Sequence, residues 1–373
     1  MKKMILLIVV FILLGSGCAV PSASDISRGS SRFGWVVTPE TSVENFQSKG
    51  GWVRLSSGVF VWGNIEKESK ATYDWSQADQ EVQKWQAQDQ ALLITLSAFA
   101  QWDQESCHGK MPQQPLLSIC YVEGYENWVR AIVERYDADG ENDMPNLKYA
   151  ITHFSIENGD NYQTTPFAYA EMFRLAHDVI KTINPESVVL LGAVSDLSED
   201  SRRYWRAFLQ TEPTRGDVAT LHSLSASNDF LTKSFREFLN QYGYHKRPLW
   251  ITAARVDTGD PTSDQDQIER LTFVNYVSAF ANGAEKIFSA DEQTTTVYPL
   301  MKELIGYWRT LERLDDHAVR FDVVDHAVYA LWGGAVLPKS VTGRVDVIQI
   351  DGTRSRMKAK DVKADVPLFV VVE

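Results

Sequence analysis

Short apolar runs alternate with amphipathic stretches along most of this chain. Runs rich in β-branched and other apolar residues occur at 34–37, 52–55, 91–96, 149–156, 188–191, 218–221, 249–252 and 286–288. Most of them are uniformly apolar, which is typical of parallel strands that are covered on both faces. The alternation of such runs with helical stretches predicts repeated βα units rather than a sandwich of two sheets.

Three of the intervening segments carry a clear helical stripe. Thr165 and Pro166 form a cap followed by proline at the first helical position, ahead of Met172, Leu175, Ala176, Val179 and Ile180. The other two stripes are Trp75, Ala78, Val82 and Trp85, and Ile268, Leu271, Val274 and Val277. Eight βα units close a barrel, so we predict an α/β fold with a (β/α)8 barrel over 33–313. A doubly wound open sheet is the competing fold, but no Gly-rich phosphate loop follows the first strand to favour it.

The hydrophobic pattern changes after Leu314. Short apolar runs at 319–323, 327–332, 345–350 and 368–372 are separated by Gly-rich or polar turns. This pattern predicts a small all-β domain of the β-sandwich type over 314–373. A domain of this size buries little core by itself, so we expect it to dock on the barrel.

The first residues have the order of a secretory signal. Lys2 and Lys3 precede an apolar run at 4–14, and Gly15-Ser16-Gly17-Cys18 follows. The run is shorter than the roughly 20 residues of a membrane-spanning helix. We therefore predict a signal peptide over 1–17.

A cysteine directly after small residues resembles the lipobox of bacterial lipoproteins, with Gly15 where that pattern prefers Leu. The resemblance implies that Cys18 is lipidated and that the protein is exported and membrane-anchored, in the periplasm or at the cell surface. Residues 18–32 are Ser-rich and lack apolar periodicity, so they predict a solvated linker.

Charge and cysteine content exclude several classes of function. A formal net charge of -12 disfavours a nucleic-acid partner, because affinity for phosphate backbones comes from clustered Lys and Arg.

Cys107 and Cys120 form an even pair in an oxidising compartment, which predicts a disulfide. A metal site needs more ligands than Cys107, His108 and Cys120 supply, and no metal or other cofactor is expected.

Two segments resemble strand motifs of the clan A glycoside hydrolases. Residues 147–161 resemble the fourth-strand motif, which ends in Trp-x-x-x-Asn-Glu-Pro; Asn158 matches its Asn, while Gly159 and Asp160 replace Glu and Pro. Residues 247–255 resemble the seventh-strand motif Lys-Pro-x-Trp-x-Thr-Glu, with Ala253 in place of Glu. In that family the first Glu is the acid/base and the second is the nucleophile. Further stretches extend the resemblance over nearly the whole mature chain, and it implies a (β/α)8 barrel with a C-terminal β domain.

The two substitutions bear directly on chemistry. A retaining glycosidase needs two carboxylates about 5 Å apart, one to protonate the leaving oxygen and one to attack the anomeric carbon. Gly159 and Ala253 supply neither group. Our leading hypothesis is therefore a catalytically degenerate, glycosidase-like lipoprotein that binds a glycan at the barrel mouth.

Two other functions stay open. An active O-glycosyl hydrolase would need relocated carboxylates, for which Glu157, Asp160 and Glu292 are the candidates. Glu157 lies two residues before Gly159, so strand alternation points it to the same interior side, where a buried structural role is the simpler interpretation. A cell-envelope scaffold that contacts other proteins is the remaining alternative.

Aromatic faces and a few hydrogen-bonding groups suffice for sugar binding. Trp62 and Trp102 follow the second and third strands, and Asn158, His222 and Arg255 stand at other strand ends, so these five residues are the predicted glycan contacts. Each also has a structural interpretation: packing for the tryptophans, a strand-end role for His222 and a pair with Asp257 for Arg255. Trp250 is expected to pack between strand layers.

The segment 137–143 has the Asp-x-Asp-Gly look of a calcium loop. A complete loop would carry Glu at its twelfth position, where this chain has Lys148. A helix-ending turn at Gly140 is the favoured interpretation.

Overall fold

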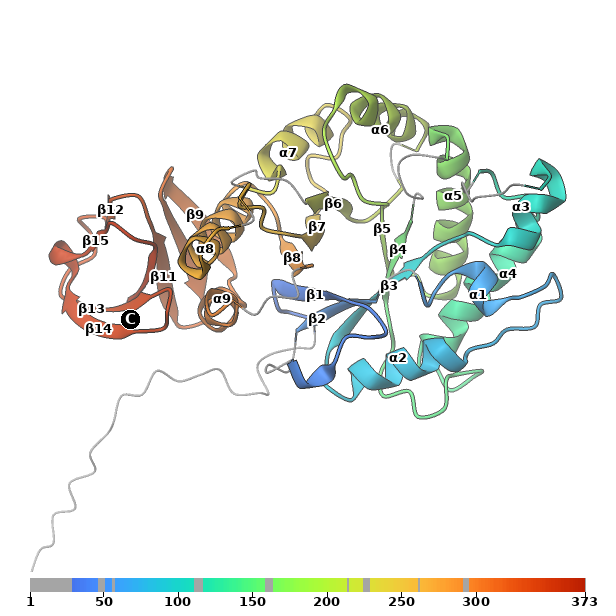
Figure 1. Cartoon of the computed structure of the whole chain (residues 1–373), viewed down its shortest axis with the longest axis horizontal. Helices are drawn as coiled ribbons and strands as arrows, with labels where there is room; N and C mark the ends of the chain where they lie inside the picture. Colours follow the sequence, from blue (N-terminus) through green and yellow to red (C-terminus); the bar gives the residue numbers. More distant parts are fainter. Residues whose placement is uncertain are drawn as a thin grey trace, which may run out of the picture.

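The computed structural model describes residues 29–45, 51–55, 58–110, 117–157, 164–212, 215–223, 229–260, 262–290 and 295–372 (Figure 1). The predicted signal peptide, Cys18 and most of the linker lie outside these residues. Asn158, Gly159, Asp160 and Glu292 also lie outside them. Within the described part of the chain, no helix has both the length and the apolar character needed to cross a bilayer.

Eight parallel strands form the sheet of a nearly closed barrel, as the sequence predicts. Its order is β5-β4-β3-β2-β1-β8-β7-β6, so β1 pairs with both β2 and β8. Between β5 and β6 the described residues form the isolated bridges Leu190 to Val218 and Val194 to Leu221. The strands are β1 Phe33–Val37, β2 Trp52–Leu55, β3 Ala91–Leu96, β4 His153–Ile156, β5 Val188–Leu190, β6 Ala219–Ser223, β7 Leu249–Ala254 and β8 Lys286–Ser289.

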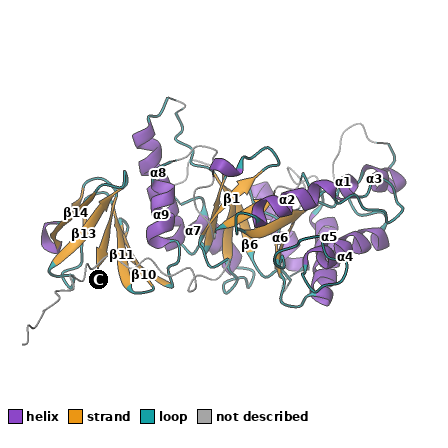
Figure 2. Cartoon of the chain, turned by 90° about the horizontal axis from the view of Figure 1, so that it is seen from below, coloured by secondary structure: helices purple, strands orange, loops and turns teal. Residues whose placement is uncertain are grey.

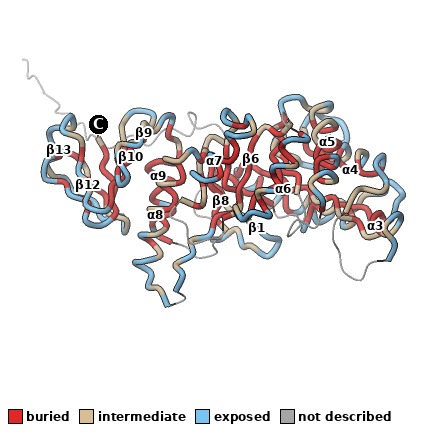
Figure 3. Tube along the Cα trace, turned by 90° about the horizontal axis from the view of Figure 1, so that it is seen from above, coloured by how far each residue is buried: buried red, intermediate tan, exposed pale blue. Residues whose placement is uncertain are grey.

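Helices surround this sheet, and the buried residues concentrate on the strands and on the helix faces turned toward them (Figures 1 and 3). The predicted cap of α5 is confirmed, because Thr165 Oγ1 accepts a hydrogen bond from Ala168 N at 3.2 Å. The helices are α1 Trp62–Ile65, α2 Ser76–Gln86, α3 Gln101–His108, α4 Val122–Tyr136, α5 Pro166–Ile183, α6 Glu199–Thr211, α7 Thr232–Asn240, α8 Gln265–Ala281 and α9 Val297–Ile305.

The fourth strand is shorter than the run at 149–156 predicts, because it begins at His153. Residues 148–151 bond to helices, whereas Thr152 O accepts a hydrogen bond from Val188 N of β5 at 2.7 Å. Lys148 N donates to Gln86 Oε1 at 2.9 Å, and Ile151 N donates to Tyr136 O at 2.8 Å. The apolar character of this segment therefore reflects packing beneath α2 and α4 rather than strand pairing.

The amino-terminal ends of the strands form a closed floor. Lys286 Nζ donates to Gly29 O at 2.9 Å and to Ser31 O at 2.8 Å, and it lies over the rings of Trp52 and Trp250. Trp52 Nε1 also donates to Gly29 O at 2.8 Å. The chain that enters the barrel thus seals its floor, and Trp250 lies between strand layers as predicted.

The C-terminal region forms a six-stranded antiparallel sheet with the order β14-β13-β16-β11-β10-β9, together with a two-stranded pair of β12 and β15. The pattern indicated four of these strands; it missed β9, β14 and the short pair. β9 begins at Thr310, ahead of the predicted start of the domain at 314. The strands are β9 Thr310–Asp315, β10 Ala318–Val323, β11 His326–Leu331, β12 Ala335–Val336, β13 Arg344–Gln349, β14 Arg354–Lys358, β15 Lys363–Ala364 and β16 Leu368–Val372.

This domain docks on the barrel through α8 and α9, which lie between the two sheets (Figure 2). Phe273 of α8 contacts the rings of Trp332 and Phe369, at 6.0 and 4.9 Å between centroids. Tyr276, one turn later, contacts Phe33 and Tyr298 on the barrel side. The predicted stripe of Ile268, Leu271, Val274 and Val277 lies in α8; Val277 is fully buried, whereas the other three side chains are only partly buried.

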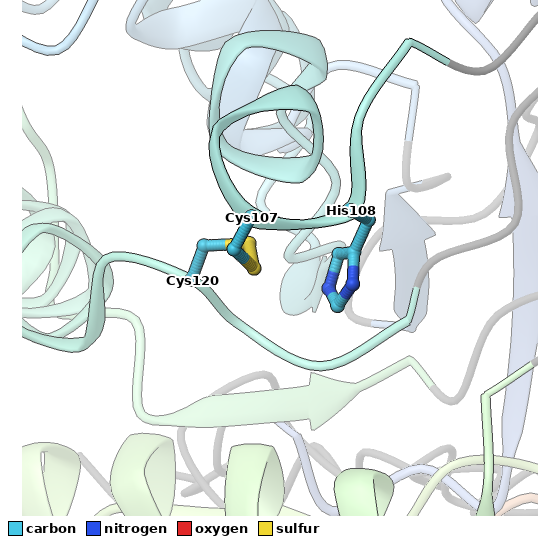
Figure 4. Close-up of side chains that lie close together, drawn as sticks. All are labelled: Cys107, His108 and Cys120. Atoms are coloured by element: carbon cyan, nitrogen blue, oxygen red, sulfur yellow. A yellow bond between two sulfur atoms is a disulfide. The ribbon is translucent and has the colours of Figure 1, made fainter.

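A disulfide joins Cys107, at the end of α3, to Cys120, just before α4, and confirms the predicted pair (Figure 4). Both sulfurs are used in this bond, so they are not available as metal ligands. The neighbouring His108 points its Nε2 at Ser118 O, 3.1 Å away.

The disulfide generates a prediction on stability. A cross-link between residues 13 apart should stabilise the fold by about 3 kcal/mol through the restricted unfolded chain. Replacing both residues, C107A/C120A, should lower the free energy of unfolding by that amount in urea titrations. Dithiothreitol should destabilise the wild type similarly and leave the double variant unchanged; an equal effect of the reductant on both proteins would contradict the assignment.

The floor generates a prediction on pH. Burial and the charge of Lys286 lower the pKa of His153 to about 4, whereas an unfolded histidine titrates near 6.5. Between these values only the unfolded chain binds the proton, so stability should rise by about 3 kcal/mol from pH 4 to pH 6.5 through this residue.

The variant His153→Phe keeps a ring against Trp250, which stacks on His153 at 5.6 Å. It should flatten this rise in urea titrations across the pH window. The matched control His245→Phe, at an exposed position, should keep it. An unchanged slope in His153→Phe would show that the rise comes from another group.

Candidate functional site

Arg54 is the central polar group at the carboxyl ends of the strands. It alternates with Val53 and Leu55 along β2, so it points into the barrel while those two face the helices. Arg54 is buried; its Nε donates to Thr95 Oγ1 at 3.1 Å and its Nη1 to Thr252 O at 3.4 Å. Sequence reasoning missed this residue, although a single cation inside an apolar strand is a detectable signal.

Glu157 provides a charge that balances Arg54. It directly follows β4, its backbone N donates to Leu96 O at 3.0 Å, and its side chain is partly buried. Burial lowers the pKa of Arg54, while the negative charge of Glu157 acts in the opposite direction. A carboxylate in the field of a guanidinium is better suited to balance charge than to donate a proton.

His222 presents an unpartnered nitrogen to the same region. It lies on β6, and its backbone N donates to Val194 O at 2.8 Å. Its Nε2 is buried and has no hydrogen-bond partner among the residues that the structure describes. Burial and the nearby charge of Arg54 hold the pKa of His222 well below its usual value, so the ring is neutral at physiological pH.

Ala253 stands where the resemblance places the nucleophile. It pairs with His222 across β6 and β7, immediately after a shift in register between the two strands. Ala253 is 8% exposed, and it brings a methyl group to a position beside polar neighbours. Arg255, two residues on, is exposed, and its backbone N donates to Ser223 O at 2.9 Å.

The two predicted aromatic contacts occupy the core side of α1 and α3. Trp62 is fully buried; its Nε1 donates to Glu66 Oε2 at 2.7 Å, and its ring meets Trp102 at 4.8 Å. Trp102 is partly buried and donates its Nε1 to Glu66 O at 2.9 Å. The prediction that Trp62 lines the mouth is thus corrected, because its ring and its donor are both used in packing.

The acidic segment after α4 forms a turn. Asp143 accepts backbone hydrogen bonds from Ala138 N at 3.0 Å and from Gly140 N at 2.8 Å, and Gly140 has a φ of +97°. The carboxylates of Glu134, Asp137 and Asp139 lie within 4.8 Å of one another. The helix ends at Tyr136, as the turn interpretation requires, and the acids of the turn bond to its own backbone.

The site comprises described residues of four strands or strand ends: Arg54 of β2, Glu157 after β4, His222 of β6 and Ala253 of β7. Asn158, Gly159, Asp160 and Glu292 lie outside the described residues. The described part can bind through a charged guanidinium, a neutral imidazole and a carboxylate.

The pairing of Arg54 with Glu157 is testable by a double-mutant cycle. Arg54→Met leaves the carboxylate without its counter-charge and should lower the free energy of unfolding by about 3 kcal/mol. Adding Glu157→Gln should recover part of that loss, because the remaining group is then neutral. Urea titrations of the four proteins measure the coupling, and strictly additive losses would show that the two side chains do not interact.

Comparison with protein-family models and with curated protein sequences finds no match. Solved structures do match. A glucosidase from Croceicoccus marinus is 12% identical with a TM-score of 0.61, over 92% of this chain and 95% of that one. A family 39 glycoside hydrolase from Bacteroides cellulosilyticus is 12% identical with a TM-score of 0.63, over 93% and 81%. A family 39 β-xylosidase from Caulobacter crescentus is 12% identical with a TM-score of 0.61, over 93% and 97%. The fold is therefore that of clan A glycoside hydrolases, a (β/α)8 barrel with a C-terminal β domain.

Proposed function

We propose that this chain is an exported lipoprotein whose glycosidase-like barrel binds a glycan at its mouth without cleaving it. The observation that carries the proposal is the composition of the strand ends. Arg54, Glu157 and His222 gather there, while Ala253 occupies the position of the family's nucleophile. Gly159 at the acid/base position completes the loss of the catalytic pair in the sequence.

The chemistry of cleavage requires more than the chemistry of binding. Breaking a glycosidic bond needs a proton donor for the leaving oxygen and an attacking carboxylate or water. Glu157 is the one carboxylate among the described residues of this site, and it interacts electrostatically with Arg54. A single carboxylate cannot supply the proton donor and the nucleophile together.

Binding of a sugar matches the groups that remain. The buried Nε2 of His222 is unpaired among the described residues, and a buried polar atom without a partner is costly. A sugar hydroxyl supplies the missing partner, and hydroxyl groups also pair well with a guanidinium or a carboxylate. The glycosidase fold supports this choice of ligand, since several of the similar structures are named as enzymes that act on glycosides.

Export and lipidation form the second half of the proposal. The signal-like start and Cys18 support an anchor at the membrane. Gly29 and Ser31 are bound at the floor of the barrel, at the end opposite the strand termini that carry Arg54 and His222. With lipid on Cys18, the tether would enter at the floor, and the mouth would open away from the bilayer.

Isothermal titration of the purified protein with a panel of neutral oligosaccharides tests the proposal. At least one member should bind, and His222→Phe should weaken that binding by about tenfold through loss of one hydrogen bond in a buried site. His245→Phe, at an exposed position away from the strands, is the matched control and should bind as the wild type does.

The same protein should release no aryl alcohol from a panel of aryl glycosides. Turnover that disappears in Glu157→Gln would overturn the proposal in favour of an active hydrolase with a relocated carboxylate. Absence of binding across the oligosaccharide panel would also overturn it.

A further inference from the structure

A groove far from the strand ends lies on the C-terminal domain. It runs between the loop at 336–344 and the segment at 358–362, which are tied together by a hydrogen bond from Ala359 N to Gly343 O at 2.9 Å. Its volume is about 600 Å³, within the range of small-molecule sites. Neither the sequence resemblance nor the barrel site accounts for it.

The floor of this groove is aliphatic. Leu337, Ala359 and Val362 are buried in the core of the domain, and Val341 packs against that core. Val336, on the rim, is 60% exposed, which is a large apolar exposure for this chain. A ligand that fills the groove therefore meets an apolar surface on one side.

The rim of the groove is basic. Lys339, Lys358 and Lys360 are exposed, and their side chains have no hydrogen-bond or ion-pair partner in the part of the chain that the structure describes. Other cations of the domain are paired, such as Lys363 with Asp365 and Arg356 with Asp346.

Charge is distributed unevenly around this groove. The stretch 336–363 has seven basic and three acidic residues, although the whole chain has a net charge of -12. Lysines that are only solvated can lie anywhere on a surface. These three lysines instead line the same concave surface. The charge pattern favours an anionic ligand.

Three kinds of anionic partner match the groove poorly. An extended peptide would need free backbone groups, but Val341 N, Ala359 N and Val362 N already donate to carbonyls of the groove. Single-stranded nucleic acid stacks its bases on aromatic rings, and the described lining contains none. A bilayer is contacted best by protruding apolar groups, whereas this surface is hollow.

We propose that the groove binds an acidic segment of a polysaccharide, such as consecutive uronate residues. Their carboxylates pair with Lys339, Lys358 and Lys360, and the apolar faces of the sugar rings lie on Leu337, Val341 and Val362. The choice of a polysaccharide rests on the proposed function, whereas the preference for an anion rests on the groove itself.

Isothermal titration of the purified full protein with tetragalacturonate tests this inference, with cellotetraose as the neutral probe of equal length. Tetragalacturonate should bind more tightly than cellotetraose, and high salt should reduce the difference because it screens exposed charges. The variant K339Q/K358Q/K360Q should lose about tenfold or more in affinity for tetragalacturonate. The control K67Q/K233Q/K246Q removes the same charge at exposed lysines elsewhere and should bind as the wild type does.

Other outcomes separate this inference from the proposed function. Equal affinity in the two triple variants would overturn the groove as the site. Loss of tetragalacturonate binding in His222→Phe, with full binding in K339Q/K358Q/K360Q, would place the anion at the barrel mouth and overturn the inference alone. Binding to phosphatidylglycerol vesicles but not to tetragalacturonate would assign the groove to lipid and also overturn it. The protein could also bind tetragalacturonate, lose this binding in K339Q/K358Q/K360Q, and bind no neutral oligosaccharide. That result would overturn the proposed glycan site at the barrel mouth and leave the groove in place.

Discussion

Burying a charged side chain is costly, so a cation that points into the barrel has to find partners there. Two cations meet this constraint at opposite ends. Lys286 at the floor bonds to carbonyls of Gly29 and Ser31, while Arg54 near the mouth bonds to Thr95 and Thr252 and is balanced by Glu157. The partners of Lys286 belong to the incoming chain, which closes the floor. The partners of Arg54 belong to strands and strand ends. The need to pair a buried cation therefore explains both the polar mouth and the closed floor.

Helix α8 packs against both the barrel and the C-terminal sheet and so joins the two domains. It is buried on two sides, with Phe273 against the C-terminal sheet and Tyr276 against the barrel. Its buried Glu269 accepts hydrogen bonds from Thr296 N and Val297 N and so fixes the start of α9. A helix that serves two hydrophobic surfaces cannot be amphipathic in the usual sense, and its removal would expose both domains.

This double burial also explains where the sequence was informative and where it was not. Uniformly apolar runs located the eight strands, because parallel strands that are covered on both faces consist almost entirely of apolar residues. The stripe of Ile268, Leu271, Val274 and Val277 located α8, but only Val277 of the four is fully buried, because a one-sided helical pattern cannot describe a helix between two sheets. The short and polar strands β9 and β14 escaped detection for a different reason: most of their residues are exposed, so no apolar alternation marks them.

The site was harder to predict than the fold, since it depends on which way individual side chains turn. Position after a strand suggested that Trp62 reaches the mouth, yet the one-turn helix α1 directs its ring into the core. The role of Arg54 emerges only when Thr95, Thr252 and Glu157, from three other strands, come together around it. Motif resemblance gave the place of Ala253, whereas its register against His222 depends on a shift between β6 and β7 that no sequence pattern marks.

The fold does not depend on a pair of carboxylates at the strand ends. The barrel is filled below the mouth by Trp52, Trp250 and Phe288, whose packing owes nothing to carboxylates at the strand ends. A carboxylate at position 253, which is 8% exposed, would be a buried negative charge, and such catalytic groups usually cost stability. With Ala253 in that position, the remaining charges of Arg54 and Glu157 offset each other and His222 stays neutral. The described groups of this site can form hydrogen bonds with hydroxyl groups of a ligand.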